Sequence, residues 1–276
     1  MSLSEILSKI FSAFKKLFGS SNTKTTDNTV HTKRVKSARE TDKKENEYLY
    51  ETNTPVNRSE ADAWTEDILT VDEMVDHLIS VESYTIHYNK GERGKTAPAG
   101  IYYKHFADWE GWRFLTHVAQ ENSIDFDPAV SNSVGCKALT ELIRTEYKAK
   151  MDDLIADFVR KEYFDKLHPE FFPGKKSALS FFSLTVHAGR RRAAKLLQKV
   201  LVQNGANIAV DGMAGSKTFA ALQESGLDDD YLNQQLLLQM YFFYNRLVAR
   251  NPAKYSRFYK GWVNRLKSLG FYEPEA

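Results

Sequence analysis

The chain has 276 residues, of which 42% are hydrophobic and 13% aromatic, so it can form a sizeable core and is not disordered as a whole. Its formal net charge is only +2, which gives no support for nucleic-acid binding. The single cysteine, Cys136, excludes an internal disulfide and is expected to be a buried or inert thiol rather than a nucleophile. The seven histidines include no pair at metal-ligand spacing on a common helix, so we expect no metal and no cofactor.

Residues 1–20 are predicted to form an amphipathic helix, because apolar residues recur at helical spacing through residues 3–18. Lysines interrupt every apolar run here, which argues against a secretory signal, and the chain has no apolar stretch of about 18 residues that could span a membrane. The apolar face must be buried on its own domain, on a partner or in a membrane interface. We expect a protein partner or self-association through residues 3–18.

Residues 21–60 are rich in Ser, Thr, Asn, Lys and Glu and are predicted to be a flexible linker. Residues 1–39 contain eight Lys or Arg and two Asp or Glu, a net charge of +6. Such an arm can be attracted to a membrane, a wall polymer or an acidic partner, or can simply be solvated. The folded part is expected to begin near residue 61.

A helix is predicted to begin at Thr70, because Thr70 and Glu73 form a capping box. One face of this helix is apolar and is made by Val71, Met74, Val75, Leu78 and Ile79. Continuing the same spacing places Glu82 where an apolar residue is expected. A carboxyl group held against an apolar face can stay protonated and donate a proton to a leaving oxygen. Alternatively, Glu82 is solvated at a frayed helix end or paired with Arg93 or Lys95.

The segment 89–101 is a polar loop with three glycines, a composition that lets backbone approach a ligand closely. An aromatic run follows, made by Tyr102, Tyr103, Phe106, Trp109 and Trp112. Aromatic rings can stack on sugars, but core packing is the commoner use of such residues and is our first interpretation.

The periodicity then predicts a helix from Lys137 to about Lys166 and a break over 164–176, where two prolines and a glycine lie. A helix that is apolar on nearly every side starts at Ser177 and ends at Gly189, so we expect it to be buried. The arginines 190–192 can hold carboxylates of a glycan or face solvent. A further long apolar helix is expected over 231–248.

The first part of the folded region resembles the N-terminal signature of glycoside hydrolase family 108, the bacterial and phage N-acetylmuramidases. That signature reads Glu-Gly-Gly-Tyr, then Asp-Pro-Gly-Gly-X-Thr, then Gly-Ile. This chain has Glu82 and Tyr84, then Gly94 and Thr96, then the pair 100–101. It departs from the signature in having one serine, Ser83, in place of two glycines, and Glu92-Arg93 in place of Pro-Gly.

The stretch 178–222 is similar to the C-terminal half of the same family, which reads Phe-Asp-X-Ala-Val-Asn-X-Gly, then Leu-Gln, then Val-Asp-Gly-X-X-Gly-X-X-Thr. The chain retains the Leu-Gln pair 197–198 and a glycine turn that resembles a small peptidoglycan-binding repeat, with Ser216 expected to cap the helix 217–222. Ser183 and His187 replace the family's Asp and Asn. The segment 258–265 resembles the family's Gly-Trp-X-X-Arg ending.

The resemblance implies a mainly α, lysozyme-like domain with a glycine-rich loop or small hairpin at its active site. It divides the folded region into an N-terminal part, 61–176, and a C-terminal part, 177–276, with a peptidoglycan-binding-like motif. The implied substrate is peptidoglycan, cleaved between N-acetylmuramic acid and N-acetylglucosamine with Glu82 as general acid. Glu92 is the first candidate for the second carboxylate. The predicted substrate contacts are Tyr84, Gly94, Thr96 and His187.

A hypothesis of another class is a catalytically inactive, muramidase-like protein that binds glycan or serves a structural role. Its N-terminal helix would then dock it to a phage particle or a secretion machine. The departures at Ser83, Ser183 and His187 favour this alternative. In either case we expect synthesis in the cytoplasm and action on the periplasmic wall after non-classical export, or presence in a virion.

Overall fold

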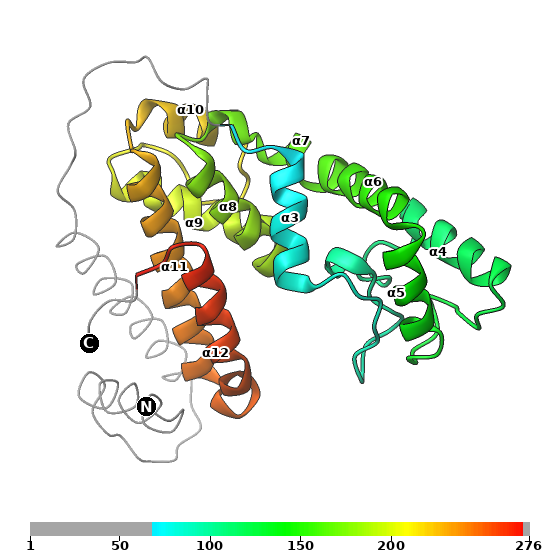
Figure 1. The fold of residues 1–276 in the computed structure, drawn as a ribbon. Coiled ribbons are helices and arrows are strands. Elements are labelled where there is room, and N and C mark those ends of the chain that lie inside the picture. Colours follow the sequence, from blue (N-terminus) through cyan, green and yellow to red (C-terminus); the bar gives the residue numbers. More distant parts are fainter. Residues whose placement is uncertain (1–67, 273–276) are drawn as a thin grey trace, which may run out of the picture. The chain divides into compact units, whose positions relative to one another are not determined.

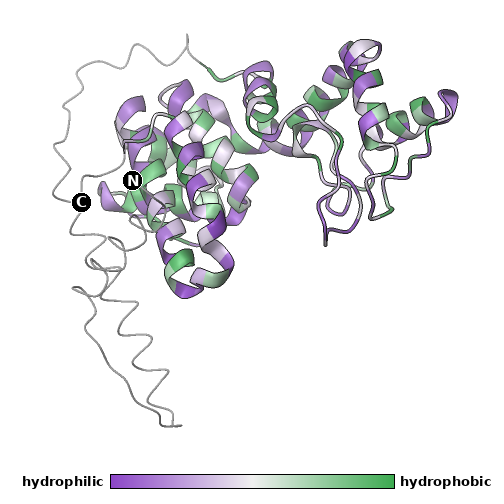
Figure 2. Ribbon diagram, turned by 60° about the horizontal axis from the view of Figure 1, so that its bottom comes forward, coloured by the Kyte–Doolittle hydropathy of each residue, from purple (hydrophilic) through white to green (hydrophobic). Residues whose placement is uncertain are grey.

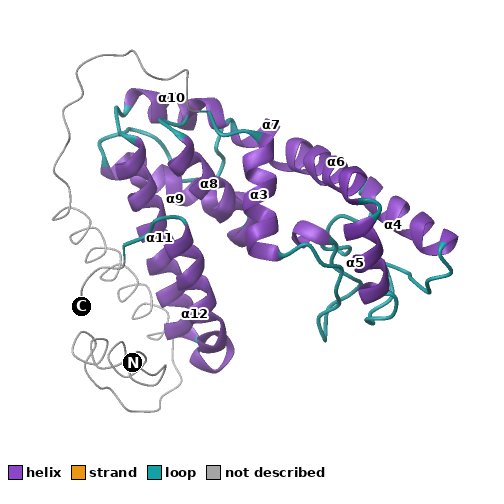
Figure 3. Ribbon diagram, in the orientation of Figure 1, coloured by secondary structure: helices purple, strands orange, loops and turns teal. Residues whose placement is uncertain are grey.

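The computed structural model describes residues 68–272. The predicted N-terminal helix 1–20 and linker 21–60 lie outside these residues. The described part is mainly helical, which confirms the predicted fold class (Figure 3). Its β pairing is limited to two isolated antiparallel bridges, His87 with Thr96 and Thr96 with Tyr102, which form the small hairpin expected near Glu82. Among residues 68–272, no helix combines the length and apolar character needed to cross a membrane.

The helices are joined by both short turns and longer loops (Figure 1). In chain order they are α3 (Val71–Glu82), η1 (Pro98–Gly100), α4 (Glu110–Glu121), α5 (Cys136–Thr145), α6 (Lys148–Val159), η2 (Arg160–Phe164), α7 (Asp165–Leu167), η3 (Pro169–Phe171), α8 (Lys175–Ala188), α9 (Arg190–Gln203), α10 (Ser216–Glu224), α11 (Asp229–Arg250) and α12 (Pro252–Ser268). Apolar and polar residues alternate around them (Figure 2), as in helices that bury one side. Helix α3 packs against η1, α6 and α8, whereas α8 also packs against α9 and α11, and α11 against α12.

The start of α3 confirms the predicted capping box. Thr70 N–H donates to Glu73 Oε2 at 2.8 Å, and Glu73 N–H donates to Thr70 Oγ1 at 3.3 Å. Four of the predicted apolar residues, Val71, Met74, Val75 and Leu78, are buried. The helix ends with Glu82 because the next residue, Ser83, has a φ of +72°.

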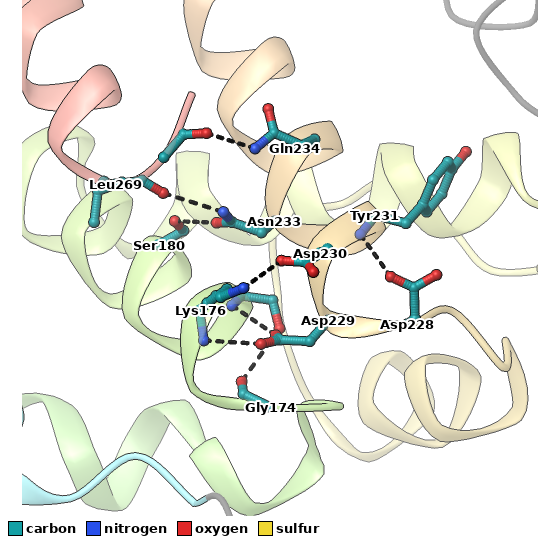
Figure 4. Close-up of polar contacts among 12 residues, drawn as sticks. Gly174, Lys176, Ser180, Asp228, Asp229, Asp230, Tyr231, Asn233, Gln234 and Leu269 are labelled. Atoms are coloured by element: carbon teal, nitrogen blue, oxygen red, sulfur yellow. Dashed lines mark hydrogen bonds and ion pairs between the residues drawn. The ribbon is translucent and has the colours of Figure 1, made fainter. Parts of the chain in front are cut away.

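Helix α8 is buried along most of its length, as predicted, and ends at Gly189, whose φ is +83°. It begins at Lys175, two residues before the predicted start, and no side chain of its own caps it. The carboxylate of Asp229, from α11, instead accepts from the backbone N–H of Lys176 at 3.1 Å and of Ser177 at 2.8 Å (Figure 4). Because this cap comes from another helix, it also ties α8 to α11.

Polar contacts made by Asn233 join the same helices further along (Figure 4). Its amide oxygen accepts from Ser180 Oγ of α8, and its amide nitrogen donates to the carbonyl of Leu269 at 3.1 Å, just after α12. The neighbouring Gln234 donates to the carbonyl of Gly270 at 2.6 Å. These bonds satisfy carbonyls that the end of α12 leaves unpaired, so α8, α11 and α12 form one connected unit.

The prediction of one helix from Lys137 to Lys166 is wrong. The chain forms α5 and α6, and the backbone leaves helical geometry between them at Tyr147, with φ −118° and ψ +16°. This turn lets both helices pack against α4. The segment after α6 widens into a π-helical turn, η2, before the predicted break.

The two tryptophans of the aromatic run after residue 101 belong to the core, which confirms our first interpretation for them, whereas Tyr102, Tyr103 and Phe106 are half-buried. Trp109 and Trp112 are buried, and their rings pack edge to face at 5.7 Å. Trp109 Nε1 donates to the carbonyl of Leu154 at 3.3 Å, and its ring contacts Phe158. The run therefore attaches the hairpin region to α6. The thiol of Cys136 is also buried, and burial raises its pKa, as expected for an inert thiol.

The side chain of Lys95 is buried inside the loop 127–132. Its ammonium donates to the carbonyls of Asp127 at 2.8 Å and Val130 at 3.1 Å, and to Asn132 Oδ1 at 3.0 Å. Three oxygens therefore surround one cation, and the residue is only 1% exposed. This lysine organises the loop that packs behind the hairpin.

Candidate functional site

Glu82 lies at the meeting point of α3 and α12. Arg265 Nη2 donates to Glu82 Oε1 at 2.9 Å, and the two side chains are 18% and 32% exposed, respectively. Glu82 is therefore neither dissolved in bulk water nor sealed in the interior. The predicted apolar surroundings are wrong, because a guanidinium contacts the carboxylate. The alternative pairing with Lys95 is also wrong, since that ammonium binds the loop 127–132.

The hairpin backbone approaches Glu82 closely at Gly100. This glycine has a φ of +73°, and a Cβ atom there would lie 3.0 Å from Glu82 Cγ. The N–H of Ala99 donates to the carbonyl of Ser83 at 3.1 Å, which joins η1 to the end of α3. The glycine-rich loop thus brings backbone close to the candidate acid, and a larger residue at position 100 would displace it.

Two histidines share the electrostatic surroundings of Glu82. Burial and, to a smaller extent, the positive charge of Arg265 lower the pKa of His187 to about 4, although Glu82 opposes the shift. The pKa of His77 is lowered by the same causes. Both histidines are therefore neutral at pH 7. His77 Nε2 lies 3.0 Å from Ser183 Oγ, and the ring of His187 packs against Tyr244 at 5.6 Å between centroids.

The phenol of Tyr244 completes this group from α11. Its ring stacks on Trp262 of α12 at 4.8 Å, and the residue is 1% exposed. Burial raises the pKa of the hydroxyl, and Arg265 opposes that rise. Among residues 68–272, this hydroxyl has no hydrogen-bond partner. A buried donor without a partner is uncommon, and it stands beside the cation that holds Glu82.

The predicted second carboxylate, Glu92, lies at the turn of the hairpin. Its Oε2 accepts from Asn89 Nδ2 at 3.1 Å. No hydrogen bond or ion pair within residues 68–272 joins Glu92 to Glu82, so the structure does not bring the two together by direct contact. In that same range, no group of three or more His, Cys, Asp and Glu side chains is arranged to hold a metal ion.

The predicted contacts Thr96, Gly94 and Tyr84 have structural partners. The backbone of Thr96 pairs with His87 in both directions, at 2.8 and 2.9 Å. A Cβ at Gly94 would lie 2.9 Å from the carbonyl oxygen of Pro128. The hydroxyl of Tyr84 donates to the carbonyl of Lys148 at 3.3 Å, and burial raises its pKa. These residues hold the hairpin against the helices behind it.

The glycine turn predicted from the second resemblance is organised by Gln198 of α9. Its Nε2 donates to Asp211 Oδ1 at 2.8 Å, to the carbonyl of Met213 at 3.1 Å and to Thr218 Oγ1 at 3.2 Å. Its Oε1 accepts from the N–H of Gly212 at 2.8 Å. The amide of Gln198 thus has all its principal donors and acceptors engaged, and the motif is structural, as expected.

Two details near this turn differ from the predictions. Helix α10 begins at Ser216, with Gly215 as its N-cap and no capping side chain, so Ser216 does not cap it. Of the three arginines after α8, Arg190 pairs with Glu162 at 2.8 Å, and Arg192 lies 4.0 Å from the ring centroid of Phe243. Both arginines therefore make contacts within the chain rather than only facing solvent.

Sequence reasoning missed Arg265, His77 and Tyr244 as members of the site. Arg265 carried a signal, because it ends the Gly-Trp-X-X-Arg pattern, but the pattern did not identify its partner 183 residues away. His77 lies five residues before Glu82 on the same helix, but it is not part of the predicted apolar face. Tyr244 lies within a long apolar run and read as core.

Residues 192–267 match the family model described as a predicted peptidoglycan domain. The C-terminal part of the chain is therefore peptidoglycan-related. The matched segment covers less than half of the chain and includes Gln198, Tyr244 and Arg265. No curated protein matches the chain. Among solved structures, SagA from Brucella abortus is 22% identical, with a TM-score of 0.46, and the match covers 72% of this chain and 90% of that one.

Proposed function

We propose that the protein is a peptidoglycan hydrolase, an N-acetylmuramidase, with Glu82 as its general acid. The observation that carries the proposal is the contact between half-buried Glu82 and Arg265. Arg265 belongs to the segment matched to the peptidoglycan domain, so a peptidoglycan-related element reaches the acid that the muramidase signature contains. The resemblance to glycoside hydrolase family 108 supports the reaction class.

In the proposed reaction, Glu82 protonates the oxygen between N-acetylmuramic acid and N-acetylglucosamine. A second carboxylate would lie about 5 Å away in a retaining enzyme, or about 6.5–9.5 Å away in an inverting one. Glu92 is our candidate for this role, and movement of the hairpin turn would bring it toward the substrate. Thr96 and Gly94 hold the hairpin, and Tyr84 and His187 are proposed to border the bound glycan.

A second candidate function is that of a glycan-binding protein without catalysis. Two observations favour it. The acid is ion-paired rather than held in apolar surroundings. In the pattern Asp-Pro-Gly-Gly-X-Thr, the aspartate lies five residues before the threonine. This position is occupied by Gly91 here, so the aspartate of the pattern is absent. In this case residues 3–18 would dock the protein to a phage particle or a secretion machine. If the protein is an enzyme, we propose the same docking role for these residues.

We propose that the site of action is the periplasmic wall, reached by non-classical export or in a virion. A pull-down with residues 1–60 from the cytoplasm of the producing cell tests this proposal. Recovery of a secretion or phage-assembly protein supports docking. If the arm binds only lipid vesicles or nothing, the docking route is wrong.

The catalytic proposal is tested by digestion of purified cell wall with the full chain, followed by a reducing-end assay. Glu82→Gln should lower the rate by about 10²- to 10⁴-fold, the usual contribution of a general acid. Its matched control is Glu121→Gln, at an exposed glutamate on α4 that pairs with His117. An active Glu82→Gln variant would rule out the assignment. An inactive wild type that still binds the wall would support the second candidate.

A further inference from the structure

Helix α12 carries a row of aromatic side chains that ends at the arginine of the Glu82 site. The members of the row follow one another at intervals of three and four residues, so they lie on one side of the helix: Tyr255, Phe258, Trp262 and Arg265. Arg265 Nη2 donates to Glu82 Oε1 at 2.9 Å, which places one end of the row at the candidate acid. The aromatic side chains therefore lead away from Glu82 along α12.

The rings of this row pack against one another and against the Glu82 site. Phe258 and Trp262 are nearly parallel, with centroids 5.8 Å apart and 20° between their planes, and Tyr255 lies 6.1 Å from Trp262. Trp262 also stacks on buried Tyr244 at 4.8 Å and lies 6.3 Å from the ring of His187. Because the rings are already held in place, a ligand that binds them loses little free energy in ordering them.

The outer part of the row is open to solvent. Phe258 is 41% exposed, and Tyr255 and Trp262 are half-buried. A single exposed apolar side chain is ordinary, but three neighbouring rings form a continuous apolar surface. We call Tyr255, Phe258 and Trp262 the α12 ridge. Rigid aromatic surface of this kind is suited to stack on sugar rings.

The charges around the α12 ridge are positive. Lys254 Nζ lies 5.0 Å from the ring centroid of Tyr255, and the guanidinium of Arg257 lies 4.5 Å from that of Phe258. Both cations belong to exposed residues, so their long side chains can move from a ring to a ligand oxygen. Residues 231–272 contain seven Lys or Arg and no Asp or Glu. The wall polymer matches this surface, because its sugar rings have apolar faces and its stem peptides carry free carboxylates.

We propose that the α12 ridge binds the sugar rings of the wall glycan as the strand runs away from Glu82. This inference rests on the proposed function and extends its site along the substrate. The helix rises about 10 Å from Arg265 to Phe258 and about 15 Å to Tyr255, which gives room for roughly two or three sugars. A strand that is long enough to reach the α12 ridge therefore binds more tightly than one that covers only the region of Glu82.

The experiment measures binding of glycan strands of two lengths to the full chain. Every protein carries Glu82→Gln, so that the strands are not cleaved. The strands are released from purified wall with an endopeptidase, which leaves stem peptides attached, and are separated into tetrasaccharides and strands at least three times as long. Phe258→Ala should lower the ratio of the long-strand to the tetrasaccharide affinity by about 5- to 10-fold, because about half of a phenylalanine side chain loses its contact with sugar.

Two alanine variants make the test specific. Tyr255→Ala lies further from Glu82 and should lower the same ratio by only a few-fold, since Tyr255 is less exposed than Phe258. Tyr272→Ala is the matched control, because Tyr272 is an aromatic residue beyond the end of α12 that is 81% exposed. This control should keep the ratio of the Glu82→Gln parent.

A second measurement uses tryptophan fluorescence of the same chain. Trp262 is half-buried, whereas Trp109 and Trp112 are buried in the core. Long strands should therefore change the emission of Trp262. Trp262→Phe keeps a ring in the α12 ridge and should remove this change. Trp64→Phe, at a tryptophan outside the described residues, should keep it.

The outcomes separate the α12 ridge from the proposed function. If Phe258→Ala keeps the parent ratio, or if the emission change survives in Trp262→Phe, the α12 ridge does not bind glycan. The same conclusion follows if Phe258→Ala keeps the ratio but alters the association state of the full chain in sedimentation, because the α12 ridge then packs on protein, such as residues 3–18. These results leave the hydrolase proposal to the reducing-end assay. If strands of neither length bind and the wild type does not digest the wall, the proposed function fails, and this inference fails with it.

Discussion

The site around Glu82 and the turn around Gln198 contain the motifs of the two resemblances, but their hydrogen bonding differs. Gln198 bonds residues within 20 positions of itself, and its amide is fully engaged. Glu82 is bonded from 183 residues away, by an arginine with spare donors and beside a tyrosine without a partner. Saturated polar groups hold a fold together, whereas unsaturated ones beside a half-buried acid are available to a ligand. Spare bonding capacity, rather than a motif, therefore identifies the functional region.

The largest expected effect on stability lies at the saturated turn. Gln198→Ala removes four hydrogen bonds, three that its amide nitrogen donates and one that its amide oxygen accepts. We expect it to lower the free energy of unfolding by about 2–4 kcal/mol. Urea denaturation measures this loss, with exposed Gln223→Ala on α10 as the control. Glu82→Gln should change stability by less than about 1 kcal/mol. Equal losses of unfolding free energy in Gln198→Ala and Glu82→Gln would contradict the difference between the saturated turn and the Glu82 site.

The next effect is a pH dependence that belongs to the Glu82 region. The pKa of His187 is about 4 in the folded protein, against 6.5 in the unfolded chain. Between these values the unfolded chain binds more protons, so this contribution is fully present above about pH 6.5 and is lost as the pH falls toward 4. At about pH 5 the loss from His187 should be about 2 kcal/mol.

Urea denaturation at about pH 7 and about pH 5 measures this loss. His187→Asn removes the titrating group and should flatten the dependence, apart from the part that His77 contributes in the same direction. His117→Asn, at an exposed histidine on α4, is the control and should keep the slope. A His187→Asn variant with the full wild-type slope would show that the pH dependence arises elsewhere.

The smallest effect concerns the residue after the acid. Ser83 has φ +72° and ψ +159°, a region that is almost restricted to glycine. Ser83→Gly should therefore raise the free energy of unfolding by about 1 kcal/mol. Ser80→Gly, inside α3, should lower it by about 0.5–1 kcal/mol. The opposite signs of these two changes, in the same denaturation assay, distinguish relief of strain from a general effect of glycine.

The sequence predicted those features that depend on neighbouring residues. The capping box of α3, the burial of α8, its end at Gly189 and the Gln198 turn follow from short-range patterns, and the structure confirms them. The break at Tyr147 was missed because helical periodicity continues across it, and only packing against α4 requires the turn. The cap that Asp229 gives to α8 was missed because it comes from another helix.

The candidate site was predicted only in part, for the same physical reason. Glu82 stands out because it interrupts an apolar pattern, and the resemblance to the hydrolase family then identified it as the candidate acid. The charge of its partner could not be predicted, because any of several cations can reach a helix end and only the tertiary fold selects Arg265. Lys95 lies closer to Glu82 in sequence, yet it binds oxygens of the loop 127–132.

The burial of Lys95 bears on whether the structure of the loop 127–132 depends on divalent ions in solution. Loops whose oxygens converge on one positive centre are often built around a bound calcium ion, which a chelator can remove. Here the positive centre is covalently part of the chain, so the order of the loop 127–132 does not depend on the supply of divalent ions. Treatment with EDTA should leave this region intact, whereas acetylation of that amine would dismantle it.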